Sequence, residues 1–175
     1  MTTSGKTNLD RLFRPMTFIE IIARLPPHIL EQLNNLKNLR EREDFHPEEN
    51  TFEHIRIVTE RLIPIGDPDL ICTAIFHDIF KLLCVKTNEK TGKPTSPGHD
   101  KFAAELLIQD ESVREFCKSL GANPDNVAWL CLQHMRVKGI DEMKQSKQDD
   151  LRNSILFHKL ETFTRADNML KDFTV

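Results

Sequence analysis

Apolar residues recur at intervals of three and four along most of the chain, whereas the alternating runs typical of half-buried strands are scarce. This period predicts an all-α fold. The expected helices span residues 16–25, 27–43, 51–62, 68–83, 99–109, 110–120, 124–137 and 149–172. Residues 86–98 collect glycine, proline and other turn-forming residues and are expected to form a long loop.

The length of 175 residues suits a single compact helical domain. Residues 1–45 are expected to form N-terminal helices packed on a core of residues 46–175. With 24 basic and 27 acidic residues the net charge is -3, which offers no broad attraction to nucleic acid or to a membrane surface. No segment reads as a signal peptide or a membrane span, so we expect a cytoplasmic protein with no membrane partner.

The segment DLICTAIFHDIFKLLCV is almost continuously apolar and is interrupted by His77, Asp78 and Lys81. A helix of this composition is buried on most sides. An unpaired carboxylate there would cost roughly several kcal/mol, so Asp78 requires a cation or must remain protonated. Because helical spacing places Lys81 near the face of His77 and Asp78, imidazole, carboxylate and ammonium groups can converge.

Three further polar residues, His54, His134 and Asp167, lie on apolar stripes and should point inward. His99 follows the loop at the start of its helix, where it could reach the interior from the rim. Each residue alone is more often a hydrogen-bonded core residue than a ligand. Four histidines and two aspartates in one small core, however, exceed what backbone groups easily satisfy, which favours a shared metal site.

Mixed imidazole and carboxylate ligands suit divalent transition metals, here Mn, Fe, Co, Ni or Zn, as one or two ions. Two divalent cations carry more positive charge than the carboxylates of Asp78 and Asp167 carry negative charge, so the site would keep a net positive charge. Such a site attracts a phosphate and lowers the pKa of bound water. These are the requirements of a phosphoester hydrolase.

The order of His54, His77-Asp78 and Asp167 resembles the H…HD…D signature of the HD superfamily of metal-dependent phosphohydrolases. The chain is most similar to the HD domain of bacterial tRNA nucleotidyltransferases, over about residues 45–168. The similar segments are FHPEENTFEH, AIFHDIFK, GHDKFAAELL, LCLQHMRV and TRADN. The residues before them leave no room for the nucleotidyltransferase domain, so CCA addition is not expected.

The resemblance implies a helical HD fold and assigns roles to the ligands. A primary metal would be held by His54, His77, Asp78 and Asp167, with Asp78 bridging to a second ion. His99 and His134 would bind that second ion or contact substrate. Metal-activated water would attack phosphorus while Lys81 neutralises phosphate oxygens, which makes Asp78 and Lys81 the catalytic pair.

Two features near the ligands bear on the substrate. The family commonly has glycine where this chain has Phe80, which either crowds the cleft or packs behind it. Arg136 and Lys138 follow His134, and lysines populate the loop at residues 86–98. Exposed loop lysines are usually only solvated, so we select Arg136, with Lys81, as the substrate-binding residues.

The leading hypothesis is a phosphohydrolase acting on a nucleotide or an RNA-end phosphoester, including 2',3'-cyclic phosphodiesterase or phosphatase activity. One alternative is hydrolysis of a free nucleotide, either a dNTP or dNMP or a cyclic dinucleotide, because one metal core serves many substrates. The other is a catalytically silent, metal-stabilised binding module, which Phe80 supports and Lys81 opposes. The oligomeric state is left open.

Overall fold

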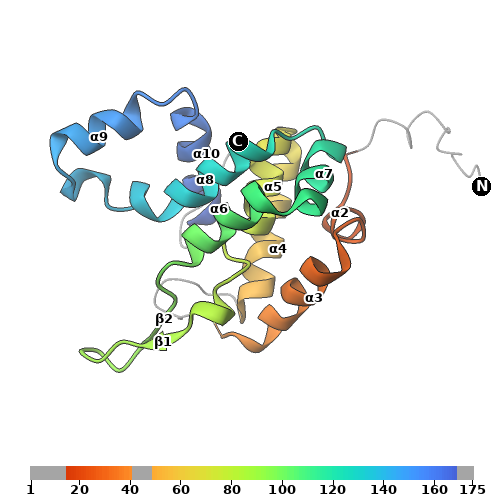
Figure 1. Ribbon diagram of the computed structural model, residues 1–175, viewed down its shortest axis with the longest axis horizontal. Coiled ribbons are helices and arrows are strands. Elements are labelled where there is room, and N and C mark those ends of the chain that lie inside the picture. The colour runs from red at the N-terminus through yellow and green to blue at the C-terminus, as the bar shows by residue number, and fades with distance from the viewer. Residues whose placement is uncertain (1–14, 41–48, 169–175) are drawn as a thin grey trace, which may run out of the picture.

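The computed structural model describes residues 15–40 and 49–168, which form one all-α domain as predicted (Figure 1). Its helices are α2 (Phe18–Ile22), α3 (Pro27–Asn35), α4 (Thr51–Leu62), α5 (Pro68–Phe76), α6 (His99–Gln109), α7 (Glu111–Ser119), α8 (Pro124–Val137), α9 (Gln145–Arg152) and α10 (Phe157–Asp167). Short 3₁₀ turns are η1 (Leu36–Asn38), η2 (Ile63–Ile65), η3 (Leu82–Cys84) and η4 (Ile140–Glu142). A two-stranded antiparallel hairpin pairs β1 (Lys86–Thr87) with β2 (Pro94–Thr95).

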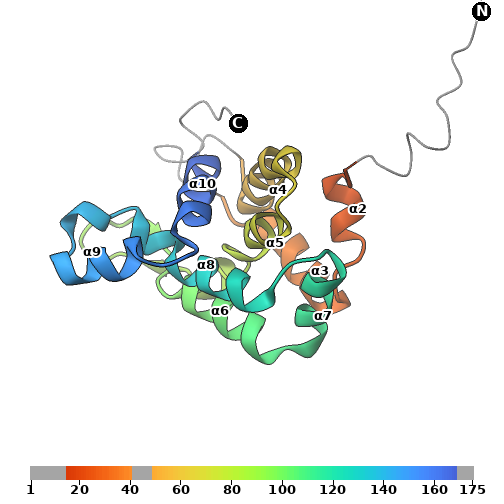
Figure 2. The same ribbon diagram turned by 90° about the horizontal axis from the view of Figure 1, so that it is seen from above.

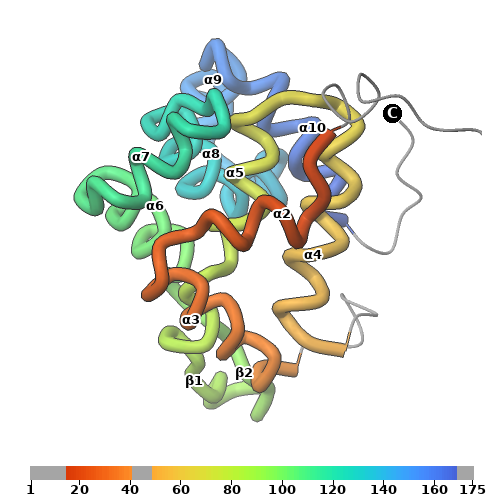
Figure 3. The backbone as a smooth tube through the Cα atoms, turned by 90° about the vertical axis from the view of Figure 1, so that its right-hand side faces the viewer, coloured from red at the N-terminus to blue at the C-terminus, as the bar shows by residue number. Residues whose placement is uncertain are grey.

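Helices α4, α5, α8 and α10 pack on one another at the centre, and α6 packs along α8. Helices α2 and α3 lie on one side of this centre, and α9 projects on the other (Figures 1 and 2). In the view of Figure 3, α9 lies above the central helices and the β1–β2 hairpin lies below them. The site described below is formed where the central helices meet.

The hydrophobic core consists of two clusters that share α4, α5 and α8. The first joins these helices to α2, α3, α6 and α7 and includes Leu33, Ile55, Phe76 and Leu107. The second joins them to α9 and α10 and includes Val58, Leu62, Leu151, Leu160 and Phe163. The three shared helices therefore carry apolar contacts on two sides, which fixes them firmly relative to each other.

The starts of α4, α5, α7 and α8 agree with the sequence prediction to within one residue because short polar side chains cap these helices. Asn50 accepts the Glu53 N–H at 3.0 Å before α4, and Asp110 accepts the Val113 N–H at 3.2 Å before α7. Helices α5 and α8 each begin with proline at the first helical position, preceded by a capping aspartate or asparagine.

A buried polar contact ties α5 to α8 and α10. The Asp69 carboxylate accepts the Asn123 N–H at 2.8 Å and the Asn126 amide at 3.0 Å, and it pairs with Lys159 Nζ at 2.7 Å. Burial opposes ionisation of Asp69, but Lys159 and these donors outweigh it and hold its pKa below the ordinary value. This tie sets the position of the three helices that carry most of the candidate site.

The predicted helix over residues 68–83 is too long. Helix α5 ends at Phe76, and the backbone then bonds three residues back, from the Ile79 N–H to Phe76 O and from the Lys81 N–H to Asp78 O. Adjacent residues of an α-helix point about 100° apart. The tighter turns after Phe76 allow neighbouring polar side chains to face one centre.

The predicted helix over residues 149–172 is wrong in its extent. The structure has α9 and α10 separated by residues 153–156, and residues 169–172 lie outside the described ranges. The Leu156 N–H is bonded to the Ser154 hydroxyl at 3.3 Å, a local alternative to helical bonding that serine offers. Between the predicted helices over residues 124–137 and 149–172, the structure has η4 and the start of α9.

Smaller differences occur elsewhere. The helix predicted over residues 16–25 is shorter in the structure, where it is α2. The helix predicted over residues 27–43 is α3, which ends at Asn35, and residues 41–43 lie outside the described ranges. The loop at residues 86–98 contains the hairpin, whose turn is closed by the Asn88 side chain and by Gly92 at φ 66°. Among the described residues, no helix has the length and apolar character needed to cross a bilayer.

Candidate metal centre

The structure brings all six predicted ligands together from five helices. His54 lies on α4, His77 and Asp78 follow the end of α5, His99 begins α6, His134 lies on α8, and Asp167 ends α10. None of the six is more than 5% exposed. Residues separated by more than 100 positions in the sequence thus meet in the interior.

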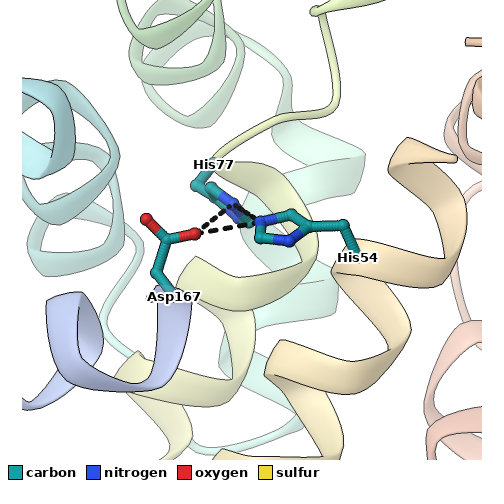
Figure 4. A group of neighbouring side chains, drawn as sticks. All are labelled: His54, His77 and Asp167. Carbon is teal, nitrogen blue, oxygen red and sulfur yellow. Dashed lines mark hydrogen bonds and ion pairs between the residues drawn. The ribbon is translucent and has the colours of Figure 1, made fainter. Parts of the chain in front are cut away.

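One group contains His54, His77 and Asp167 (Figure 4). His54 Nε2 lies 2.9 Å from Asp167 Oδ1 and 3.3 Å from His77 Nε2. The distance from His77 Nε2 to Asp167 Oδ1 is 3.5 Å. Three nitrogen and oxygen atoms therefore point at a common position and could hold a metal ion.

A second group contains Asp78, His99 and His134. His99 Nε2 lies 3.1 Å from Asp78 Oδ1 and 3.3 Å from His134 Nε2. His134 Nε2 lies 3.8 Å from the same carboxylate oxygen. This group too could hold a metal ion.

The Asp78 carboxylate lies between the two groups and offers one oxygen to each. Its Oδ2 is 3.1 Å from His77 Nε2 and 3.6 Å from His54 Nε2, whereas Oδ1 faces His99 and His134. A carboxylate placed in this way can bridge two cations.

Three histidine rings are oriented by backbone carbonyls. His77, His99 and His134 place Nδ1 within 2.9, 2.6 and 2.6 Å of the carbonyl oxygens of Ala74, Ser96 and Cys131. Because a carbonyl only accepts, each Nδ1 carries the proton and donates it. Metal-ligating histidines are typically held by such an outer bond, which directs Nε2 to the ion.

Two buried carboxylate oxygens, Asp78 Oδ1 and Asp167 Oδ2, accept no hydrogen bond within the described chain. His99 Nε2 and Lys138 Nζ nevertheless lie 3.1 and 2.7 Å from them. A histidine that donates from Nδ1 to a carbonyl group, as His99 does to Ser96 O, can turn the lone pair of Nε2 toward Asp78 Oδ1. A buried anionic oxygen in this position fits a bound cation.

The pKa values of the two central histidines move in opposite directions. Burial would lower the pKa of His77, but the charges of Asp78 and Asp167 outweigh it and raise this pKa to about 9. Burial and the positive charge of His77 lower the pKa of His134 to about 3. Without metal, His77 is therefore protonated at neutral pH and His134 is neutral.

The two carboxyl groups are held ionised. Burial would raise their pKa values, but His77 and Lys81 for Asp78, and Lys138 and the histidines for Asp167, keep both pKa values well below the ordinary range. Lys81 Nζ lies 2.8 Å from Asp78 Oδ2. The centre thus keeps its anionic ligands charged at neutral pH.

An open pocket of about 520 Å³ leads to this centre. Asp78, His99, Lys81 and Lys138 line it together with Arg40. The remaining lining residues are mostly apolar or small: Leu39, Val85, Pro94, Thr95, Ser96, Pro97, Gly98, Asp100 and Met135. A charged ligand group can therefore reach the buried cluster while the rest of the ligand meets apolar surface.

Lys81 lines the pocket, whereas Arg136 does not. Arg136 Nη1 donates to Gln133 Oε1 at 2.7 Å, and its side chain does not line the pocket. Lys138 lines it instead. Residues i and i+4 share a helix face whereas i and i+2 do not, so the spacing from His134 could have indicated Lys138.

Phe80 packs behind the pocket. Its ring lies 6.2 Å from the Phe102 ring and rests on the first hydrophobic cluster, and it is not among the residues that line the pocket. Phe80 therefore leaves the entrance to the centre uncrowded.

Arg40 and Leu39 are pocket residues that the sequence did not indicate. They follow η1, and Arg40 pairs with Asn50 as an isolated bridge just before α4. Their proximity to the centre depends on this tertiary contact, which has no local sequence signal.

Comparison of the chain with protein-family models, with curated proteins and with solved structures found no match.

Proposed function

We propose that this protein is a metal-dependent phosphohydrolase of the HD type, acting on a nucleotide or on the phosphoester at an RNA end. The observation that carries the proposal is the placement of Asp78, whose two oxygens face two separate groups of ligands. This arrangement fits a dinuclear site, a design that recurs in enzymes that cleave phosphoesters.

The ligand set supports a borderline transition metal. Four imidazole nitrogens and two carboxylates match Mn, Fe, Co, Ni or Zn better than magnesium, which prefers an all-oxygen shell. When bound, such ions supply Lewis-acid polarisation of the phosphoryl group and activation of water.

The protein's own residues supply binding and orientation. Lys81 is 15% exposed, contacts Asp78 and lines the pocket, so its ammonium group can neutralise phosphate oxygens as charge develops. The carbonyl bonds of the histidine rings fix the ligands before substrate arrives. The burial of the cluster keeps bulk water away from all but the pocket side.

The pocket supports a substrate of limited size. Its volume of about 520 Å³ lies within the ordinary range for small-molecule sites, so we expect a ligand of the size of a mononucleotide or of the last nucleotide of a strand. The net charge of -3 gives no broad attraction to a long nucleic acid.

The test is hydrolysis by protein stripped of metal and reloaded with Mn²⁺ or Ni²⁺. Substrates are p-nitrophenyl phosphate, bis-p-nitrophenyl phosphate, 2',3'-cyclic nucleotides and a panel of free nucleotides. We expect turnover of at least one class, and a fall of at least about 100-fold in Asp78→Asn, because the carboxylate that faces both groups of ligands loses its charge.

A matched control is Asp125→Asn, which removes an exposed carboxylate in the first turn of α8 and should leave activity unchanged. Absence of hydrolysis of every substrate by the loaded wild-type protein would contradict the proposal. Hydrolysis that persists in Asp78→Asn would do the same.

A further inference from the structure

Lys138 is the second lysine that meets a buried carboxylate at the pocket. It follows α8 directly, four residues after His134, and its Nζ lies 2.7 Å from Asp167 Oδ2. Lys81 holds the equivalent position at Asp78, at 2.8 Å. Each carboxylate of the centre thus has an ammonium group beside it, and both ammonium groups line the same pocket.

The exposure of Lys138 distinguishes it from a purely structural partner of Asp167. Its side chain is 38% exposed, whereas that of Asp167 is 1% exposed. An ammonium group has three N–H donors, so contact with one carboxylate oxygen leaves capacity to bind a ligand oxygen in the pocket.

The local charge indicates which phosphate this pair favours. Two divalent ions, two carboxylates and two ammonium groups leave four positive charges when the histidines are neutral. A phosphomonoester carries nearly two negative charges above about pH 6, whereas a diester carries one. Each added cation near the phosphate therefore favours the monoester more strongly.

We propose that Lys138 binds a non-bridging phosphate oxygen and is a specificity-determining residue that directs the site to dianionic phosphomonoesters over monoanionic diesters. This inference rests on the proposed function and narrows its substrate class to terminal phosphates. The apolar residues Leu39, Val85 and Met135 line the same pocket and are available to the organic group of the ester.

The test compares Lys138→Met with wild type on p-nitrophenyl phosphate and on bis-p-nitrophenyl phosphate, after the Mn²⁺ content of each protein has been equalised. Loss of a charged hydrogen bond should lower kcat/KM for the monoester by about 10- to 100-fold, and for the diester by less than about tenfold. Lys138→Arg keeps the charge and should retain most of the preference for the monoester.

A second readout does not need turnover. Calorimetric titration of the Mn²⁺-loaded proteins with inorganic phosphate should show affinity lost in Lys138→Met and in Lys138→Gln, and retained in Lys118→Met. Lys118 is a matched lysine on α7 that pairs with Glu111 and does not line the pocket. A role limited to neutralising Asp167 would alter metal affinity but neither phosphate affinity at equal metal content nor the monoester-to-diester ratio.

Failure of the inference and failure of the proposed function are distinguishable. Equal monoester-to-diester ratios and equal phosphate affinities in wild type and Lys138→Met would overturn the assignment of Lys138 while leaving hydrolysis intact. A loaded wild-type protein without turnover would contradict the proposed function, and the phosphate titration would still decide whether Lys138 binds phosphate.

Discussion

Two histidines that approach the same carboxylate have opposite acid–base behaviour. Both His77 and His134 are buried, but His77 lies beside both aspartates and its pKa rises to about 9. Burial and the nearby positive charge of His77 both disfavour the protonated form of His134, and its pKa falls to about 3. In the absence of metal, a proton on His77 therefore supplies part of the positive charge that the aspartates require.

We expect the metal-free protein to be most stable near pH 6.5. His77 binds its proton more tightly in the folded protein than in the unfolded chain. Its contribution to the free energy of unfolding is therefore complete below pH 6.5 and is lost as pH rises to about 9. His134 binds its proton less tightly when folded, so stability is lost as pH falls from 6.5 toward about 3. Each contribution changes by at most about 1.4 kcal/mol per pH unit.

Thermal unfolding of the chelator-treated protein across pH 4 to 9 measures this dependence. A melting temperature that is constant or rising between pH 6.5 and 9 would show that His77 is not held protonated by the aspartates. Saturating Mn²⁺ should reduce the loss of stability at alkaline pH, because the bound metal replaces the proton of His77 as the positive charge beside the aspartates.

At the residue scale, the sequence located the six clustered residues because each polar side chain interrupts an apolar helical pattern. Their division into two groups with Asp78 between them was expected only from family resemblance. Arg136 was predicted to bind substrate, in preference to Lys138, because it is closer to His134 in the sequence. Helical geometry places the residue four positions on at the same face, and the structure has Lys138 there.

At the scale of elements, α4 holds the end of α10 in place. Arg61 of α4 donates to Ala166 O at 2.9 Å and lies within 3.5 Å of Asn168 O. Free carbonyl groups at the end of a helix need such partners, and Ala166 precedes Asp167 directly. His54 lies two turns earlier on α4, so Arg61 fixes the spacing between two candidate ligands.

We expect Arg61→Met to weaken metal binding by about 10-fold or more at the group formed by His54, His77 and Asp167, as loss of outer contacts commonly does. Arg56→Met is the matched control, since Arg56 is on the same helix but pairs with Glu53 and Glu60 at the surface. Calorimetric titration with Mn²⁺ measures both variants. Equal Mn²⁺ affinity in Arg61→Met and Arg56→Met would contradict a positioning role for Arg61.

The starts of α4, α5 and α8 were predictable from the sequence, whereas the end of α5 and the break before α10 were not. Caps and first-turn prolines mark the starts of α4, α5 and α8 in the sequence itself. The end of α5 at Phe76 depends on the convergence of His77 and Asp78 on a centre built by other helices. The break before α10 depends on a weak serine signal that periodic apolar residues conceal.

At the scale of the whole molecule, the centre lies where the two hydrophobic clusters meet. His77 follows Phe76 of the first cluster, and its ring lies 5.1 Å from the Phe163 ring of the second. Metal bound there would join five helices, and its binding free energy would add to the stability of the fold.

The spacing of apolar residues along the sequence was enough to predict the all-α class, but it did not predict the pocket. Its lining comes from the segment after η1, the segment after α5, strand β2 and the residues that follow it, the start of α6 and the end of α8. Only tertiary packing brings these segments together, so no local pattern predicts Leu39, Arg40 or Met135 as neighbours of the centre.

Anomalous diffraction from crystals of Mn²⁺-loaded protein tests the central claim most directly. We expect two anomalous peaks, one among His54, His77 and Asp167 and one between His99 and His134, with an oxygen of Asp78 beside each. Absence of any anomalous peak at these six residues, at a Mn²⁺ concentration that saturates the protein in solution, would contradict the account.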